Sequence, residues 1–281
     1  MRLKSAISEG FCAIICPVKP FIVITGAGSG IGRATAQAFA KRGARLALCD
    51  IDSGKVAELQ RELGAAVVLV ETVDVANREQ MHAFFARVLA IDVPSVLINN
   101  AGVSVGGTFV DTSIDDWDWL MGINLRGVML GCHHVVPAMI AVKRGGHIVN
   151  ISSVFGHWGA PLVSAYVASK FAVFGFSQSL RAELAPHGIG VSAVCPGMIN
   201  TEIVTSGRMV GATASRREHL AKRFRRGSDP ARAAAAIVSA IERNQAVRPV
   251  GNDGWALWAM SRTVPWLRDR IGERLIRMTS R

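Results

Sequence analysis

The sequence lacks several features that would place it in a more specialised class. No apolar run reaches the ~18 residues that a membrane span needs, so we expect no transmembrane helix. The five cysteines are an odd number, and neither they nor the histidines show the spacing of metal ligands. We therefore expect reduced thiols, no metal site and a cytoplasmic protein.

Acidic residues are scarce in the last third of the chain. Up to Gly207 the sequence has 16 basic and 15 acidic side chains, whereas from Arg208 onward it has 16 basic and 6 acidic ones. Such a basic segment indicates an acidic partner, an anionic substrate or a membrane surface, or else a solvated face that aids solubility. No aromatic platform or groove-binding helix accompanies the cations, so we expect no nucleic-acid partner.

Short apolar runs alternate with amphipathic stretches, which is the pattern of β-α-β units. We predict an α/β fold: a Rossmann-like, doubly wound parallel sheet of about seven strands with helices on both faces. The predicted strands are Phe21–Thr25, Arg45–Cys49, Ala66–Val70, Ser95–Ile98, His147–Ile151, Gly190–Val194 and Ala246–Val250. The predicted helices are Ile31–Arg42, Ser53–Gly64, Arg78–Leu89, Leu125–Val142, Ala165–Ala185 and Ala231–Glu242. We expect an N-terminal extension over 1–20, one domain over 21–251, and a basic amphipathic helical segment of that domain over 252–281.

A glycine-rich segment follows the first predicted strand and opens the first predicted helix. Residues without a Cβ let the backbone approach a pyrophosphate, and the free N–H groups at a helix N-terminus favour an anion. The spacing Gly-x3-Gly-x-Gly between a strand and a helix therefore indicates a dinucleotide site. The expected cofactor-binding residues in this turn are Gly26, Gly28, Ser29, Gly30, Ile31 and Gly32.

Asp50 ends the second predicted strand, where a carboxylate accepts hydrogen bonds from the hydroxyls of the adenosine ribose. A 2′-phosphate would be repelled there, and neither Ser29 nor Ile51 supplies a cation to neutralise it. Arg33 is the one nearby cation that leaves NADP open. We therefore predict NAD rather than NADP as the cofactor, with Asp50 and Ile51 beside the ribose.

Tyr166 and Lys170 lie four residues apart on a predicted helix, so both project from one face. A phenol with a pKa near ~10 is rarely ionised at neutral pH, and a nearby ammonium is expected to lower that pKa. Ser153 ends the preceding strand and is suited to holding a substrate oxygen against the phenol. Tyr166 is the only tyrosine in the chain, so no other phenol can replace it.

Five motifs together resemble the classical short-chain dehydrogenase/reductase family over roughly Phe21 to Val250. They are Thr25–Gly32, Asn99-Asn100-Ala101-Gly102, Ser153, Tyr166-x3-Lys170 and Pro196-Gly197. The resemblance implies hydride transfer between NAD(P) and an alcohol or ketone, with Tyr166 as general acid/base and Lys170 bonding the nicotinamide ribose. It further implies that Ser153 positions the substrate oxygen and that Asn124 holds a water in a proton relay through Lys170. The other cofactor contacts that it implies are Asp74, Val75, Asn100, Ala101, Gly102, Pro196, Gly197, Ile199 and Thr201.

Some of these residues have simpler interpretations. Asn99 and Asn100 are also suited to capping a strand end, and Asn124 to capping a helix. Ser152 competes with Ser153 for the substrate oxygen, and the family spacing of thirteen residues before the tyrosine favours Ser153.

The sequence carries weaker signals about the substrate than about the cofactor. His157 and Trp158 follow the serine and are candidate contacts beside Ser153 and Tyr166. The segment 203–226, where the family places a mobile substrate lid, is rich in arginine. Beyond the sheet, tryptophans alternate with arginines, which fits either a lipid interface or a helix packed on the core. We expect a small-molecule substrate that is a bulky, apolar secondary alcohol or ketone, lipid-, retinoid- or steroid-like, with peripheral membrane contact through the C-terminal segment left open.

Two other functions stay open at this point. A 3-oxoacyl carrier-protein reductase would use the basic lid to dock an acidic carrier, although the missing cations at positions 29 and 51 argue against its usual NADPH. A regulatory protein that binds the dinucleotide without turnover would not need the serine, tyrosine and lysine. The resemblance also implies a homodimer or homotetramer that assembles through the helices Leu125–Val142 and Ala165–Ala185.

Overall fold

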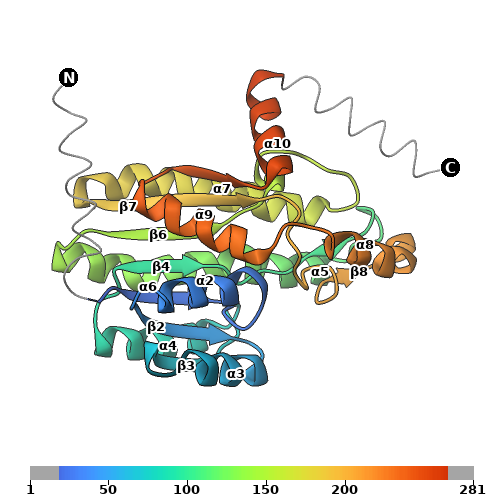
Figure 1. The fold of residues 1–281 in the computed structure, drawn as a ribbon. Helices are drawn as coiled ribbons and strands as arrows, with labels where there is room; N and C mark the ends of the chain where they lie inside the picture. Colours follow the sequence, from blue (N-terminus) through green and yellow to red (C-terminus); the bar gives the residue numbers. More distant parts are fainter. Residues whose placement is uncertain (1–18, 265–281) are drawn as a thin grey trace.

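A seven-stranded parallel sheet forms the centre of the protein in the computed structural model, which describes residues 19–264 (Figure 1). The strand order is β3-β2-β1-β4-β6-β7-β9, so the chain reverses direction across the sheet between β1 and β4. The strands are β1 Phe21–Thr25, β2 Arg45–Asp50, β3 Val67–Thr72, β4 Val96–Asn99, β6 Gly146–Ile151, β7 Ile189–Pro196 and β9 Val247–Val250. In doubly wound sheets, ligands bind where the strand order reverses, at the carboxyl ends of the strands.

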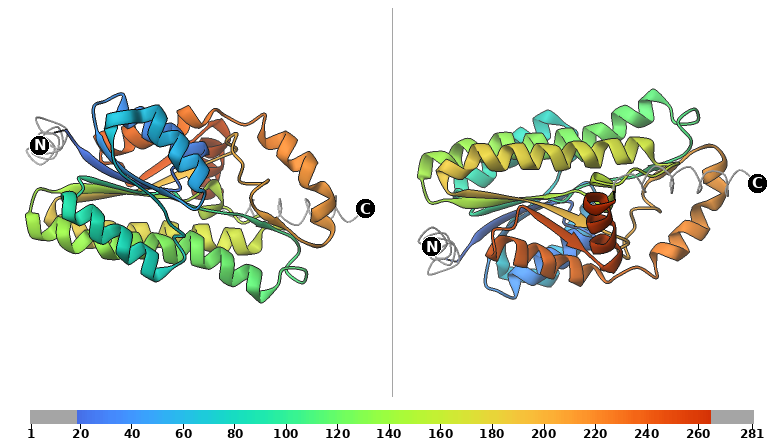
Figure 2. Two further views of the ribbon diagram at one scale, coloured as in Figure 1. Left: turned by 90° about the horizontal axis from the view of Figure 1, so that it is seen from below. Right: turned by 90° about the horizontal axis from the view of Figure 1, so that it is seen from above.

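Helices cover both faces of the sheet, and Figure 2 shows the two helical layers on either side of it. Alternate strand residues serve the two layers: Ile22 and Ile24 pack towards α2 and α9, whereas Phe21 and Val23 pack towards α4, α6 and α7. The helices are α2 Gly30–Ala40, α3 Ser53–Leu63, α4 Arg78–Ile91, α5 Ile114–Met121, α6 Gly127–Val142, α7 Ser164–Leu184, α8 Arg217–Phe224, α9 Pro230–Glu242 and α10 Asn252–Thr263. The predicted fold class and all seven predicted strands are confirmed, with ends that differ by up to two residues.

The helix predicted to start at Leu125 is wrong in its start. It begins at Ile114 as α5 and reaches α6 through a π-helical turn, Gly122–Arg126. Ser113 caps α5, because its side chain accepts from the Asp116 N–H while the Asp116 carboxylate accepts from the Ser113 N–H. This Ser-x-x-Asp capping box is a sequence signal for the helix start that the periodicity argument missed.

The continuous helix from Ile114 to Val142 bears on the expectation that the chain has no transmembrane helix. Its most apolar 18-residue window has a mean hydropathy of 1.4, which by length and composition alone suits a membrane span, although no unbroken apolar run is present. A single such helix is weak evidence, because a core helix passes the same test. Here α6 packs against α4 and the strands β4 and β6.

A smaller two-stranded parallel sheet lies at one end of the molecule. It pairs β5, Val105–Gly106, with β8, Arg208–Met209, and so joins the segment before α5 to the predicted lid segment. Within the lid segment, a 3-10 turn Gly211–Arg216 leads into α8. Figure 1 shows α5, β8 and α8 together at this end.

The C-terminal helix α10 packs against β9 and against the short 3-10 turn Val154–Gly156 that follows β6. Of the tryptophans that follow the sheet in the sequence, Trp255 and Trp258 belong to α10 and lie edge to face, with ring centroids 5.7 Å apart. The expectations for residues 1–18 and 265–281 lie outside the described part of the chain.

Candidate active site

The glycine-rich turn between β1 and α2 has the geometry that a close backbone approach requires. Gly26 has φ +62°, a conformation that favours glycine, and a Cβ at Gly32 would collide with the Gly26 carbonyl oxygen. Ser29 is the extended N-cap of α2, and its side chain makes no capping hydrogen bond. The first-turn N–H groups of α2 therefore face an anion site without a competing side-chain cap or an acidic residue.

Thr25 and Asn100 hold this turn against β4. The Thr25 hydroxyl accepts from the Asn100 and Ala101 N–H groups at 3.1 and 3.2 Å. The Asn100 amide donates to the carbonyls of Thr25 at 3.0 Å and of Gly26 at 2.8 Å. The side-chain amide nitrogen of Asn100 is thus bonded to the turn, as expected if Asn100 caps the strand end. The other polar atoms of Asn100 remain for a ribose.

Asp50 lies beside the turn at the end of β2. Its carboxylate accepts from the Gly28 N–H at 2.8 Å and from the Asp52 N–H at 3.1 Å. A Cβ at Gly28 would meet this carboxylate, so the turn and Asp50 are in direct contact. Ile51, next in the chain, is 67% exposed and contributes no charge.

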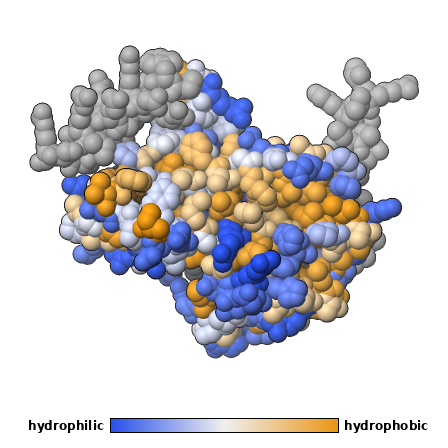
Figure 3. All heavy atoms as spheres, turned by 180° about the vertical axis from the view of Figure 1, so that it is seen from behind, coloured by the Kyte–Doolittle hydropathy of each residue, from blue (hydrophilic) through white to orange (hydrophobic). Residues whose placement is uncertain are grey.

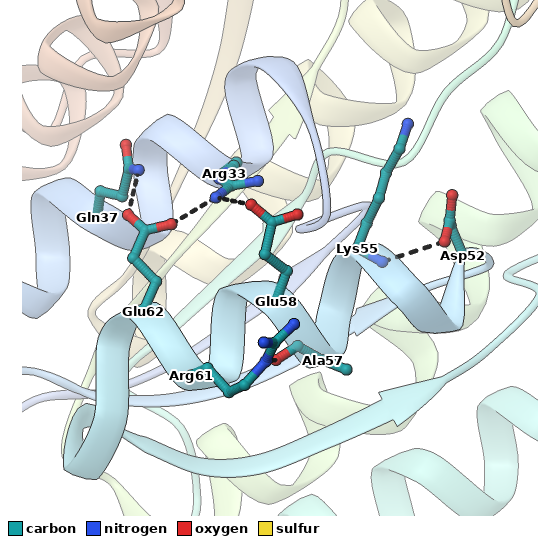
Figure 4. A network of polar contacts seen from close by, with 8 residues as sticks. All are labelled: Arg33, Gln37, Asp52, Lys55, Ala57, Glu58, Arg61 and Glu62. Carbon is teal, nitrogen blue, oxygen red and sulfur yellow. Dashed lines mark hydrogen bonds and ion pairs between the residues drawn. The ribbon is translucent and has the colours of Figure 1, made fainter.

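Arg33, the cation that left NADP open, is held away from this site. Its guanidinium pairs with Glu58 at 2.8 Å and with Glu62 at 2.6 Å, both on α3, and Gln37 also donates to Glu62 (Figure 4). These carboxylates raise the pKa of Arg33. Lys55, near Asp50, is paired with Glu202 at 2.5 Å.

Asp74 and Val75 follow β3 and approach the same edge of the sheet. The Asp74 N–H donates to Gln80 at 2.8 Å, and its carboxylate accepts from the Ala76 N–H at 2.9 Å, which fixes this turn. Val75 is buried and packs among the apolar residues beneath the sheet.

Tyr166, Lys170 and Ser153 come together from α7 and the end of β6. The Lys170 ammonium donates to the Ile151 carbonyl at 3.0 Å and lies 5.6 Å from the centre of the Tyr166 ring. The Ser153 hydroxyl is hydrogen-bonded to Tyr166 and accepts from the Phe155 N–H at 3.2 Å. Lys170 is 3% exposed, so its charge is almost fully removed from water.

Burial is the main influence on the pKa values of Tyr166 and Lys170. Burial raises the pKa of Tyr166 to about 12, and the Ser153 hydrogen bond offsets only part of this. Burial also lowers the pKa of Lys170 to about 8. Lys170 is not among the causes of the shift at Tyr166, so the predicted lowering of the phenol pKa by Lys170 stays a prediction.

Ser152 and Ser153 separate clearly in the structure. The Ser152 hydroxyl is buried and donates to the Lys170 carbonyl at 2.9 Å, so it supports α7. Ser153 is the serine beside Tyr166. The choice of Ser153 on spacing therefore agrees with the geometry.

Asn124 lies in the π-helical turn and is fully buried. Its side chain accepts from the Val103 N–H at 2.8 Å and donates to the Val103 carbonyl at 2.9 Å and to Ser169 at 3.1 Å. A Cβ at Gly102 would lie 3.4 Å from both the Asn124 oxygen and the Lys170 nitrogen. Both polar atoms of the Asn124 side chain are thus bonded to protein groups.

His157 and Trp158 are both buried beside the site. Burial, with Arg262 of α10 nearby, lowers the pKa of His157 to about 4, so the ring is neutral at physiological pH. Neither ring nitrogen has a hydrogen-bond partner within residues 19–264, and the ring lies 6.1 Å from that of Phe174.

The segment after Pro196 carries Ile199 and Thr201 across the glycine-rich turn, where Thr201 would contact a Cβ placed at Gly30. Sequence reasoning missed the residue that fixes this segment, Asp253 of α10. Its carboxylate accepts from the Met198 N–H at 2.7 Å and occupies the space that a Cβ at Gly197 would need.

Apolar side chains surround the tyrosine on the side of the lid. Phe155 lies edge-on to the Tyr166 ring at 6.3 Å, and Val103 and Trp119 belong to the same apolar cluster as Tyr166. Arg208, at the base of the lid, stacks on Trp119 at 4.1 Å and pairs with Asp116 at 2.9 Å.

Comparison with known proteins agrees with this geometry. The sequence model of the short chain dehydrogenase family matches residues 20–209, more than half of the chain. The crystal structure of a short chain dehydrogenase/reductase from Burkholderia phymatum in complex with NAD superimposes with a TM-score of 0.77 and 32% identity. That match covers 82% of this chain and 88% of the other.

Two curated relatives extend the comparison. The mouse protein "Dehydrogenase/reductase SDR family member 7B" is 37% identical over 80% of this chain and 71% of its own length. "Probable oxidoreductase EphD" of Mycobacterium tuberculosis is 39% identical over 87% of this chain, and this chain spans only 43% of the length of EphD. The chain therefore belongs to the short-chain dehydrogenase/reductase family of oxidoreductases.

Proposed function

We propose that this enzyme interconverts a bulky, apolar secondary alcohol and its ketone, with NAD as the hydride carrier and Tyr166 as the proton-transferring group. The observation that carries the proposal is the cluster of Ser153, Tyr166 and Lys170 at the end of β6, next to a glycine-rich turn that admits a pyrophosphate. Both parts lie at the carboxyl ends of the parallel strands.

The protein residues handle the proton. A nicotinamide cofactor held at this site would supply the chemistry of hydride transfer. Tyr166 gives its phenolic proton to the ketone oxygen in reduction and removes the alcohol proton in oxidation. Ser153 donates a hydrogen bond to the substrate oxygen and keeps it beside the phenol. Lys170, anchored by the Ile151 carbonyl, bonds the nicotinamide ribose. Asn124 holds the water through which Lys170 is reprotonated.

The cofactor contacts follow the edge of the sheet. The α2 N-terminus binds the pyrophosphate, Asp50 and Ile51 contact the adenosine ribose, and Asp74 and Val75 contact the adenine. The segment from Pro196 to Thr201 holds the nicotinamide end. The further contacts proposed are Asn100, Ala101 and Gly102.

The preference for NAD rests on charge. Asp50 presents a carboxylate where a 2′-phosphate would stand, and Arg33, the cation best able to neutralise that phosphate, is already bonded to Glu58 and Glu62. Releasing Arg33 would break both of these ion pairs.

The preference for an apolar substrate rests on the surroundings of Tyr166. Phe155, Trp119 and Val103 give the lid side of the site an apolar lining, and Trp158 is buried beside it. His157 is neutral and adds no charge. An anionic or sugar-like substrate would leave its polar groups without partners there.

We further propose that the enzyme is a cytoplasmic homodimer, or a homotetramer built from such dimers, that assembles through α6 and α7. Figure 3 shows a broad hydrophobic area on the face that these helices cover. A hollow of about 910 Å³ lies there, lined in part by Met129, Leu130, Phe176 and Leu180. Burying this face against a second copy would remove it from water.

One experiment tests both cofactor and substrate. The enzyme is assayed by NADH absorbance with short-chain, long-chain and steroid-sized alcohols and ketones, and with a 3-oxoacyl thioester, each with NAD(H) and NADP(H). We expect the highest kcat/KM for a large apolar alcohol or ketone with NAD(H). A preference for the thioester with NADPH would support a carrier-protein reductase instead, and cofactor binding without turnover of any compound would support a regulatory role.

A further inference from the structure

Three of the most exposed large apolar side chains in the described chain lie within six residues of one another. Phe109 is 72% exposed, Val110 is 91% exposed and Ile114 is 74% exposed. They occupy the loop between β5 and α5 and the first residue of α5. Aromatic and branched side chains exposed together on a projecting loop usually mark a contact surface.

A strongly basic segment begins beside this loop, since a Cβ at Gly211 would meet Asp111. The segment 216–226, which contains α8, carries six cations and a single carboxylate, Glu218. None of the six pairs with a carboxylate among residues 19–264. They are Arg216, Arg217, Lys222, Arg223, Arg225 and Arg226.

The small sheet brings the two features together. Because β5 and β8 run parallel, the loop after Gly106 and the segment after Met209 leave this sheet in the same direction. Thr213 donates to the Gly106 carbonyl at 2.7 Å, which ties the start of the basic segment to the start of the loop. In Figure 3 isolated hydrophobic side chains stand out among polar ones at this end of the molecule.

We propose that this surface, here called the lid tip (Phe109, Val110, Ile114 and the six cations of 216–226), docks on a bilayer that contains anionic phospholipids. The apolar side chains enter the interface and the cations contact the headgroup phosphates. Apolar residues on a convex tip, flanked by unpaired arginine and lysine, match the chemistry of such a surface. The docking adds to the proposed function and does not depend on which alcohol is oxidised.

Nearby carboxylates limit how far the lid tip enters the bilayer interface. Asp111 is turned back on its own loop, where its carboxylate accepts from the Thr108 hydroxyl at 2.7 Å. Asp115 follows Ile114 in α5 and Asp118 lies about one turn further along the same helix face, and both are exposed. The tip therefore enters through Phe109 and Val110, and the acidic side of α5 stays in water.

An acidic carrier protein is the main rival occupant. A carrier of this kind would pair its carboxylates with the cations of α8 and would leave Phe109 and Val110 on the loop beside it exposed. Exposed apolar groups and exposed cations both occur on the two segments that leave the small sheet in the same direction, which favours a lipid interface in which both kinds are used.

The test is co-sedimentation of the full-length enzyme with vesicles of phosphatidylcholine alone or mixed with phosphatidylglycerol, at low and high NaCl. We expect binding only to the mixed vesicles, weakened by salt. Phe109→Ser/Val110→Ser and Lys222→Glu/Arg223→Glu should each bind about tenfold more weakly or worse. The matched controls Val68→Ser, 38% exposed on β3, and Lys41→Glu/Arg42→Glu, after α2, should bind like the parent.

Thermal unfolding of each variant shows whether it is folded. The proposal is overturned if the mixed vesicles bind no enzyme, or if folded lid-tip variants bind as tightly as the controls, because the contact then lies elsewhere in the chain. Binding of an acidic acyl carrier protein in place of the vesicles would likewise overturn it.

Discussion

At the scale of single residues, the site holds a phenol that the protein makes harder to ionise and an ammonium that it makes easier to discharge. Burial is the cause of both shifts: the pKa of Tyr166 is raised to about 12 and that of Lys170 is lowered to about 8. At neutral pH the tyrosine therefore carries its proton and the lysine its charge. This protonation state is ready for reduction of a ketone, in which the tyrosine acts as an acid.

Replacing Tyr166 by Phe removes the proton donor and leaves the ring in place. We expect turnover to fall by about 100-fold to 10,000-fold, because no second tyrosine can take over, while NAD still binds. Steady-state kinetics and cofactor fluorescence titration measure the two effects. Ser152→Ala, which alters only a bond to the α7 backbone, is the control expected to keep far more activity than Ser153→Ala. Wild-type turnover in Tyr166→Phe would rule out the mechanism.

The two directions of the reaction should respond oppositely to pH. Oxidation needs the phenolate, so its kcat/KM should rise with pH throughout the alkaline range below the phenol pKa of about 12. Reduction needs the phenol and, in the proposed relay, a protonated Lys170 that returns its proton. Its kcat/KM should therefore be level near neutrality and fall above pH about 8, where Lys170 loses its charge. Rate profiles in both directions check this, and an oxidation rate that is flat from neutral to alkaline pH would contradict it.

At the scale of helices and strands, the C-terminal helix α10 fixes the segment that carries Ile199 and Thr201. The Asp253 carboxylate bonds the Met198 N–H, and β9 bonds the same turn through the Val250 carbonyl, which accepts from the Gly197 N–H at 3.0 Å. The last described strand and helix, β9 and α10, thus position the proposed nicotinamide end of the site.

Replacing Asp253 by Ala should loosen that segment. We expect KM for NAD to rise about tenfold with a smaller change in kcat, because the lost hydrogen bond fixes a cofactor-binding segment and no group that transfers the proton. Asp253→Asn keeps an acceptor oxygen and should restore most of the affinity. If Asp253→Ala lowers kcat and leaves KM for NAD unchanged, the residue does not act through this segment.

Sequence patterns predicted the sheet well, because each buried strand is a short apolar run between turns and helices. They predicted that Ser153, Tyr166 and Lys170 lie together for a related reason. A spacing of four residues puts Tyr166 and Lys170 on one face of a helix, and Ser153 follows the end of a strand. They failed for Asp253, because its partner lies 55 residues away and no local spacing reveals the contact. They could not give the extent to which burial raises the phenol pKa, because burial depends on the packing of several distant segments.

At the scale of the whole molecule, two surfaces are left for other molecules. The face of α6 and α7 exposes Met129 at 46% and Phe171 at 38%, although most large apolar side chains of the described chain are buried. The lid tip lies at the end of the molecule formed by β5, β8 and α8. A dimer formed through the first surface would leave the second available.

A charge placed on the α6 and α7 face should separate the subunits. We expect Met129→Lys to shift the enzyme from dimer to monomer in analytical ultracentrifugation, because a lysine buried in an apolar interface would have no partner. Val68→Lys, on the far edge of the sheet, should leave the assembly unchanged. A parent enzyme that sediments as a monomer would contradict the proposed assembly.

Positions 197 and 253 cannot vary independently. Since the Asp253 carboxylate fills the volume beside Gly197, any larger residue at 197 demands a shorter one at 253. Gly197→Ala alone should therefore be more harmful than Gly197→Ala combined with Asp253→Gly, a case of epistasis between the middle and the end of the chain. Among sequences that diverge from this one, the two sites should covary, and a homologue with a bulky residue at the first should have lost the acid at the second.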